Sequence, residues 1–109
     1  MDGDYCMVMT TYADAAVGSR IIEALLAGRL AACVQAVPIG SHYHWKGNVV
    51  HEQETLLLIK TTAALYPAVE ERIKALHPYE IPEILRVPVT SGLASYLRWV
   101  DESVAPPAG

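Results

Sequence analysis

Apolar and polar positions follow two rhythms along this chain, one typical of strands and one typical of helices. Tyr5 to Tyr12 is rich in β-branched, aromatic and apolar residues and predicts a buried first strand. Ala31 to Val37 predicts a second strand of small residues and valine, Val49 to Thr61 a long third strand, and Ile84 to Val89 a fourth. The small side chains of the second strand would allow another element to approach it closely.

The connection between the second and third strands predicts a long hairpin. Ser41 to Lys46 has an extended pattern, and Gly47 can supply a tight turn. Pro38 and Gly40 predict a bulge or bend within the hairpin, and Pro88 suits an edge strand. The tip of such a hairpin would project beyond the core of one subunit.

A helical spacing separates the first two strands. Val17, Ile21 and Leu25 recur four residues apart and predict one apolar helix face. Asp14 can accept hydrogen bonds from the first turn, and Gly28 can end the helix in the left-handed conformation.

Two more helices are predicted, from Ala63 to Leu76 and from Leu93 to Val104. Pro67 is acceptable in the first turn of the former, and Trp99 lies beside the apolar face of the latter. The inward-facing positions are Leu65, Val69, Ile73, Leu76, Leu93, Leu97 and Val100.

The order strand, helix, strand, strand, helix, strand, helix predicts an α+β fold. It is the ferredoxin-like split βαβ sandwich with one added C-terminal helix. We expect a single domain over residues 1–109, with residues 1–4 and 105–109 as loose tails.

Composition adds an expectation about assembly. Hydrophobic residues make up 52% of the 109-residue chain, and the mean hydropathy of +0.24 is high for a small soluble monomer. A tight core or an interface between subunits would explain this, and we favour the interface.

Charge and segment length narrow the partners. No apolar run reaches the roughly 18 residues of a membrane span, and the Met1-Asp2-Gly3-Asp4 start is acidic. Net charge is -4 with scattered basic residues, which disfavours nucleic acid and anionic membranes. We therefore expect a cytoplasmic protein. Cys6 and Cys33 could pair, but that compartment favours buried free thiols.

Three histidines suggest a metal site on the hairpin. If Lys46 and Gly47 form a two-residue turn, His42 lies directly opposite His51 and His44 lies diagonal to it. Neutral imidazoles suit copper, zinc or nickel. The alternative is that all three are exposed polar positions on the outer face of the hairpin.

The run His77-Pro78-Tyr79-Glu80-Ile81-Pro82-Glu83-Ile84 predicts a stiff, extended loop, because proline disfavours helix in the residue before it. The residues that could line a groove between subunits and bind a small polar ligand or a cation are Trp45, Lys60, Tyr79, Glu80 and Glu83. A structural role is the alternative: the carboxylates pair at a subunit contact, and Tyr79 is a buried aromatic with a satisfied hydroxyl.

This run closely resembles the signature of the CutA family of divalent-cation tolerance proteins. Three further segments match in order and spacing: Arg29-Leu30-Ala31-Ala32-Cys33-Val34, Tyr43-His44-Trp45-Lys46-Gly47 and Leu58-Ile59-Lys60-Thr61. The resemblance implies a ferredoxin-like homotrimer, similar to the PII signalling trimers, whose hairpins pack against neighbouring subunits. It also implies a non-enzymatic binding or signalling protein linked to metal tolerance.

Copper binding in that family uses a cysteine and two histidines. At the matching positions this chain has Thr10, Leu76 and His77, so only the last is a potential ligand. These replacements disfavour copper binding by the family's route, so a divalent metal such as copper would bind weakly or through other residues. His77 stays a candidate ligand beside the hairpin histidines.

Catalysis has little support in the sequence. There is no glycine-rich phosphate loop, nucleophile elbow or His-x-x-x-His helix, and Glu52 and Glu54 are typical of a solvated strand face. We assign no catalytic residue. Two alternatives to a binding protein remain: a small enzyme with Glu83 or His77 as general base in an intersubunit cleft, and a scaffolding trimer that binds another protein.

Overall fold

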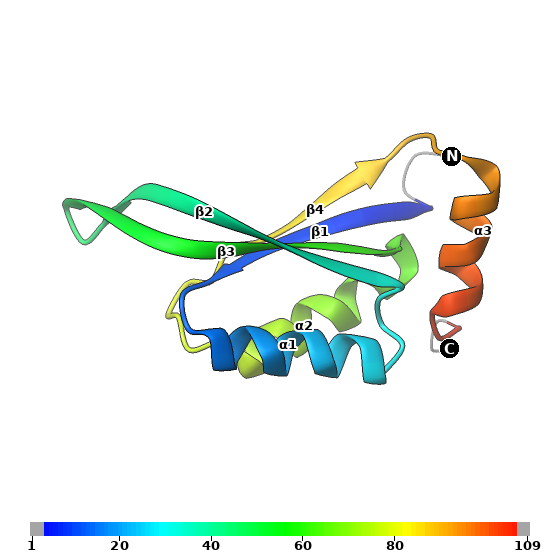
Figure 1. The fold of residues 1–109 in the computed structure, drawn as a ribbon, viewed down its shortest axis with the longest axis horizontal. Coiled ribbons are helices and arrows are strands. Elements are labelled where there is room, and N and C mark those ends of the chain that lie inside the picture. The colour runs from blue at the N-terminus through cyan, green and yellow to red at the C-terminus, as the bar shows by residue number, and fades with distance from the viewer. Residues whose placement is uncertain (1–3, 107–109) are drawn as a thin grey trace.

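Four antiparallel strands form one sheet in the computed structural model, which describes residues 4–106. The elements are β1 (Tyr5–Tyr12), α1 (Ala15–Ala27), β2 (Cys33–Trp45), β3 (Asn48–Thr62), a 3-10 turn (Ala63–Leu65), α2 (Tyr66–Leu76), β4 (Ile84–Val89) and α3 (Ala94–Ser103). The strand order β2-β3-β1-β4 is that of the ferredoxin-like fold, as predicted. Helices α1 and α2 cover one face of the sheet, and α3 stands at one end (Figure 1).

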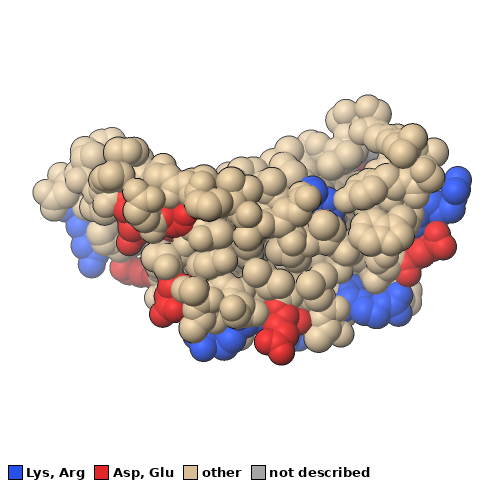
Figure 2. Space-filling view, viewed as in Figure 1, with Lys and Arg blue, Asp and Glu red and all other residues tan. Residues whose placement is uncertain are grey.

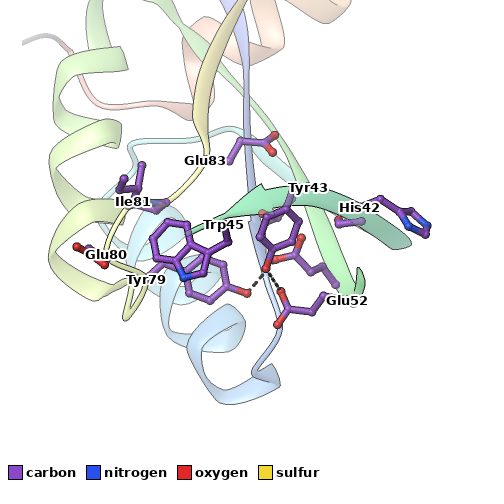
Figure 3. Close-up of a pocket in the computed structure, with 12 residues that line it drawn as sticks. His42, Tyr43, Trp45, Glu52, Tyr79, Glu80, Ile81 and Glu83 are labelled. Atoms are coloured by element: carbon purple, nitrogen blue, oxygen red, sulfur yellow. Dashed lines mark hydrogen bonds between the residues drawn. The ribbon is translucent and has the colours of Figure 1, made fainter. Parts of the chain in front are cut away.

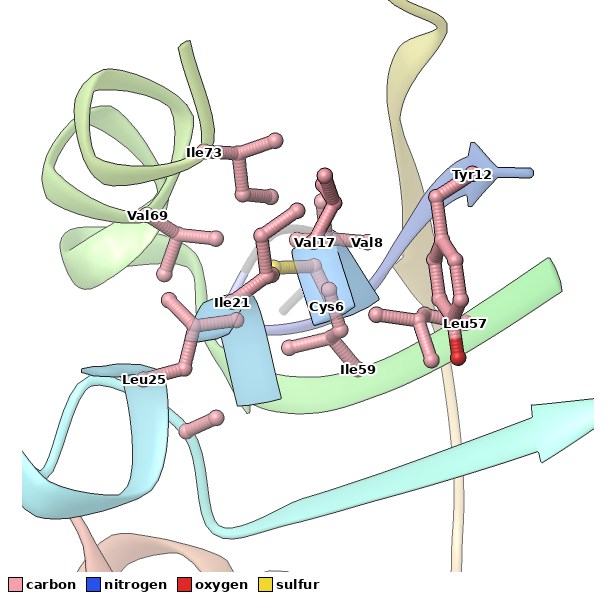
Figure 4. Close-up of a cluster of buried hydrophobic side chains, with 11 residues drawn as sticks. Cys6, Val8, Tyr12, Val17, Ile21, Leu25, Leu57, Ile59, Val69 and Ile73 are labelled. Carbon is pink, nitrogen blue, oxygen red and sulfur yellow. The ribbon is translucent and has the colours of Figure 1, made fainter. Parts of the chain in front are cut away.

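The core lies between the sheet and the helix pair α1 and α2. Alternate β1 side chains, Cys6, Val8 and Thr10, are buried on this side, opposite Thr61, Ile59 and Leu57 of β3. Ile21 and Leu25 from α1 and Val69 and Ile73 from α2 complete the cluster (Figure 4). Burying each large apolar side chain stabilises the fold by about 1.5–3 kcal/mol.

The start of α1 follows the prediction, but its end does not. Asp14 Oδ1 accepts a 2.8 Å hydrogen bond from the backbone N–H of Ala16, as expected of an N-cap. Gly28 is right-handed, with φ of -80°, and the left-handed residue is Arg29, with φ of 54°. Three carbonyls at the C-terminal end of α3 accept hydrogen bonds from the Arg29 guanidinium, each at 3.2 Å. These contacts hold Arg29 in the conformation that the sequence predicts for Gly28.

The predicted long β2–β3 hairpin is confirmed, and it is more regular than expected. Pairing runs without interruption from Cys33 opposite Lys60 to Trp45 opposite Asn48, so the predicted bulge at Pro38 and Gly40 is wrong. Pro38 is tolerated because β2 is an edge strand, and the same holds for Pro88 in β4. Lys46 and Gly47, with φ of 49° and 82°, form the two-residue turn on which the predicted register depends.

The chain ends correct two further expectations. Leu93 precedes α3 and is 73% exposed, so it is not part of the inward face. The backbone carbonyl of Asp4 accepts a 3.0 Å hydrogen bond from Ala63, and the Ala105 N–H donates to Arg29 at 2.8 Å. These two tail residues are therefore held in place; the tail residues 1–3 and 107–109 lie outside the described part of the chain.

The sheet face opposite α1 and α2 carries exposed apolar side chains. Val37 on β2 and Leu85 and Val87 on β4 are 39%, 53% and 37% exposed. Space-filling atoms show a hollowed upper surface with few charged residues, while most charges lie on the lower half (Figure 2). Part of the apolar surface of the chain therefore lies outside its core. Among residues 4–106 no helix is long and apolar enough to cross a membrane.

Candidate functional site

A cleft of about 610 Å³ lies between the β2–β3 hairpin and the loop that joins α2 to β4. The hairpin contributes Ser41, His42, Tyr43, Trp45, Glu52 and Glu54; the loop contributes Tyr79, Glu80, Ile81, Pro82 and Glu83; and Thr11 completes the lining. Trp45 from the hairpin and Tyr79 from the loop both line it (Figure 3). A concave site with aromatic walls and several convergent carboxylates is suited to binding a small ligand.

Two phenol–carboxylate pairs organise the cleft. The Tyr79 hydroxyl donates a 2.8 Å hydrogen bond to Glu54 Oε2, and the Tyr43 hydroxyl donates a 2.7 Å bond to Glu52 Oε1. Burial, followed by the hydrogen bond to Glu54 and its charge, raises the pKa of Tyr79 far above its ordinary value. The hydrogen bond to Glu52 is the main cause of the raised pKa of Tyr43. Both phenols therefore remain neutral donors at neutral pH.

His77 fixes the start of the loop. Its side chain is buried, and its Nδ1 accepts a 3.2 Å hydrogen bond from the backbone N–H of Tyr79. The neutral ring then carries its proton on Nε2, which donates to the carbonyl of Thr11 at 2.7 Å. Both nitrogens are thus engaged within the chain, and a metal ion at His77 would have to displace one of these contacts.

The charge of the cleft is negative. Four glutamates, Glu52, Glu54, Glu80 and Glu83, belong to the lining, which includes no lysine or arginine among the described residues. At the rim, the ammonium of Lys46 lies 3.9 Å from Glu80 and 5.5 Å from the ring centre of Trp45. The mouth of the cleft therefore already holds one ammonium group of the chain itself.

Four of the five residues predicted for a groove meet in this cleft: Trp45, Tyr79, Glu80 and Glu83. The fifth, Lys60, lines a separate hollow of about 310 Å³ beside α3, where its ammonium donates to Gln35. The hydroxyl of Tyr79 is satisfied, as the structural alternative anticipated.

The interpretation of Glu52 and Glu54 as a solvated face is wrong for Glu54, which is only 9% exposed. The register that places His42 opposite His51 also places Tyr43, Trp45 and Glu52 together on the other face of the hairpin, and that signal could have identified this wall of the cleft. No pattern in the sequence indicated that the loop after α2 would cover Glu54.

The hairpin histidines have the predicted register. His42 lies opposite His51, and their rings stack with centres 4.1 Å apart and planes 3° apart. His44 lies opposite Val49 and therefore diagonal to His51. Although His42 borders the cleft, its ring is directed away from it (Figure 3). No group of three or more histidine, cysteine, aspartate or glutamate side chains in the described chain is arranged to hold a metal ion.

The two positions at which the family resemblance expects copper ligands and this chain has none are buried or partly buried. Thr10 is fully buried on the helix-facing side of the sheet, and Leu76 packs against the core. Cys6 is buried, Cys33 is half-buried, and both thiols are free, as expected. Burial raises the pKa of the Cys6 thiol, which opposes formation of a metal-binding thiolate.

Comparisons with known proteins agree on one family. The family model described as CutA1 divalent ion tolerance protein matches residues 6–103. The divalent-cation tolerance protein CutA of Thermus thermophilus is 47% identical over 98 residues, which cover 89% of this chain and 95% of the relative.

Solved structures lead to the same result. The Cut A1 structure from Thermus thermophilus superposes with a TM-score of 0.88 at 45% identity, covering 93% of this chain and 99% of that one. The periplasmic divalent cation tolerance protein CutA of Archaeoglobus fulgidus gives a TM-score of 0.89 at 33% identity, with the same coverage.

Proposed function

Because this chain belongs to the CutA1 divalent ion tolerance family, we propose that it contributes to divalent-cation tolerance by reversible metal binding at its hairpin imidazoles. It does so as a homotrimer and without catalysing a reaction. The observation that supports the metal site is the opposed pair His42 and His51, whose rings are 4.1 Å apart at an exposed position. Rotation about the side-chain bonds of two opposed exposed imidazoles lets both direct a nitrogen at one ion.

The donor set indicates which metals to test. Imidazole nitrogens favour copper, nickel and zinc over magnesium and calcium, which prefer oxygen. Two protein ligands leave the remaining coordination positions to water, to His44 or to a neighbouring subunit. We therefore expect moderate affinity and no structural dependence on the metal.

The homotrimer is supported by the apolar sheet face. Val37 on one edge strand and Leu85 and Val87 on the other expose apolar side chains on the same sheet face, and exposed apolar surface commonly marks an interaction surface. A second and third copy of the chain would cover this face and remove it from water.

The absence of catalysis is supported by the state of His77. Its Nδ1 lone pair accepts the Tyr79 N–H, so the ring offers no free base to a substrate. Glu83 is exposed. The two phenols that are hydrogen-bonded to carboxylates, Tyr79 and Tyr43, have raised pKa values, which disfavours their ionisation to nucleophiles.

A cytoplasmic location is also proposed. The free thiols of Cys6 and Cys33 suit a reducing compartment. The Archaeoglobus relative is described as periplasmic, so fractionation of expressing cells should decide between the two compartments.

The test is calorimetric titration of metal-free, tag-free protein with Cu²⁺, Zn²⁺ and Ni²⁺. We expect saturable binding that is lost in the double variant His42→Ala/His51→Ala. The single variant His44→Ala is the matched control, because it removes an exposed imidazole from the same face of the hairpin. A partial loss there would make His44 a third ligand. Equal binding by the double variant and the unchanged protein would refute the proposed site.

A further inference from the structure

The carboxylate cleft has properties that suit a ligand other than a metal ion. Its volume of about 610 Å³ far exceeds that of a bare ion. Two of its carboxylates already accept hydrogen bonds from phenols, at Glu52 and Glu54. The residues described here contain no three-ligand group for a metal. Together, these three observations favour a ligand that is a cation larger than a bare metal ion.

The walls combine acidic and aromatic groups. Trp45, Tyr43 and Tyr79 present π-systems, whose faces attract cations, and Ile81 and Pro82 add apolar surface. Each phenol engages one oxygen of its carboxylate, so the second oxygen of Glu52 and of Glu54 remains for a ligand. Glu54 should attract a cation more strongly than Glu52, because it is only 9% exposed and solvent screens its charge weakly.

An ammonium group already rests at the mouth of this cleft. The Nζ atom of Lys46 lies 3.9 Å from a Glu80 oxygen and 5.5 Å from the Trp45 ring centre. The side chains of Lys46 and Glu80 are exposed, so this contact is weak and can open. The mouth of the cleft, at Glu80 and Trp45, thus already accommodates a primary ammonium group on an aliphatic chain.

We propose that the cleft between the β2–β3 hairpin and the Tyr79–Glu83 loop binds a primary alkylammonium ion. The ammonium head hydrogen-bonds to the free oxygens of Glu54 and Glu52 and faces the Tyr79 and Trp45 rings. The aliphatic chain lies against Ile81 and Pro82, where its burial removes apolar surface from water. This site is distinct from the imidazole pair, because the His42 ring is directed away from the cleft (Figure 3).

Fluorescence of Trp45 provides the readout. Trp99, the other tryptophan, lies on α3 and is replaced by phenylalanine so that one indole reports. The full-length Trp99→Phe protein is titrated with n-butylammonium, with n-butanol as the uncharged ligand of similar shape and with Mg²⁺ as a bare cation. We expect a saturable change with n-butylammonium only.

Variants locate the site. In the same background, Glu54→Gln should weaken n-butylammonium binding about tenfold or more, because a hydrogen bond to a charged group is replaced by one to a neutral amide. Glu71→Gln removes the same charge from the exposed side of α2, where Glu71 pairs with Lys74, and should change affinity less than about twofold. Lys46→Gln should leave binding intact or strengthen it, because it removes a competing ammonium.

Several results would overturn the proposal. These are equal responses to n-butanol and n-butylammonium, equal weakening by Glu54→Gln and Glu71→Gln, or no saturable response. The double variant His42→Ala/His51→Ala should bind n-butylammonium normally. Metal binding that survives in His42→Ala/His51→Ala would refute the metal site alone, and n-butylammonium binding that survives unchanged in Glu54→Gln would refute the cleft site alone.

Discussion

The hydroxyl of Tyr79 donates a 2.8 Å hydrogen bond to Glu54, and this contact joins the loop after α2 to the middle of β3. Residues 25 positions apart thereby close one side of the cleft. The bond satisfies a nearly buried carboxylate that no other described contact pairs. Its loss should therefore affect stability as well as the shape of the cleft.

Replacing Tyr79 by phenylalanine should lower the free energy of unfolding by about 1–3 kcal/mol, because Glu54 loses its donor while remaining shielded from water. Urea denaturation at fixed protein concentration measures the change. Tyr43→Phe is the matched control, since it removes the same type of bond to Glu52 at an exposed position. Its cost should be under about 1 kcal/mol, and equal costs for the two variants would contradict this account.

Alkaline pH should reduce the contribution of Tyr79 to the free energy of unfolding. The folded-state pKa of Tyr79 is raised above the unfolded value of about 10, so its contribution is complete below pH 10 and is lost as pH rises toward the folded pKa. The stability difference between the unchanged protein and Tyr79→Phe should therefore shrink from about pH 9 to about pH 11. Denaturation at both pH values measures it, and a constant difference would show that the two states share one pKa.

Gly18 in α1 should not tolerate alanine. A Cβ atom there would lie 2.1 Å from the Tyr12 ring, whose side chain is buried at the end of β1. Alanine normally stabilises a helix by up to about 1 kcal/mol relative to glycine, but displacing the ring should reverse the sign and give a net loss of about 1–3 kcal/mol. Thermal unfolding of Gly18→Ala measures the result. Ser19→Ala, at the adjacent exposed helix position, is the control and should leave stability nearly unchanged.

The uncovered sheet face should control assembly. Light scattering should give about three times the 11.9 kDa subunit mass for the unchanged protein. Leu85→Glu places a charge on the exposed apolar face and should yield a smaller species. Leu26→Glu changes an equally apolar residue that is 43% exposed on α1, and it should leave the mass unaltered. A monomeric mass for the unchanged protein would refute the interface.

Local chemistry made much of the fold predictable. The turn at Lys46 and Gly47 and the two-residue period of strands were enough to pair His42 with His51, because antiparallel register follows once the turn is known. Asp14 capped its helix for an equally local reason, since its side chain bonds to the N–H two residues away. The family could likewise be identified from short motifs, because the prolines in the run from His77 to Ile84 restrict its backbone locally.

Long-range contacts decided the remainder. Arg29 takes the left-handed conformation because carbonyls from the end of α3, more than 70 residues away, accept bonds from its guanidinium. Glu54 is buried because Tyr79 lies over it, while Lys60, on the same strand, ends in another hollow. The sequence by itself thus determined the elements, their order and the hairpin register, all of which depend on neighbouring residues. Only the tertiary structure decided which side chains share the cleft, because that depends on how the twisted hairpin and the loop meet in space.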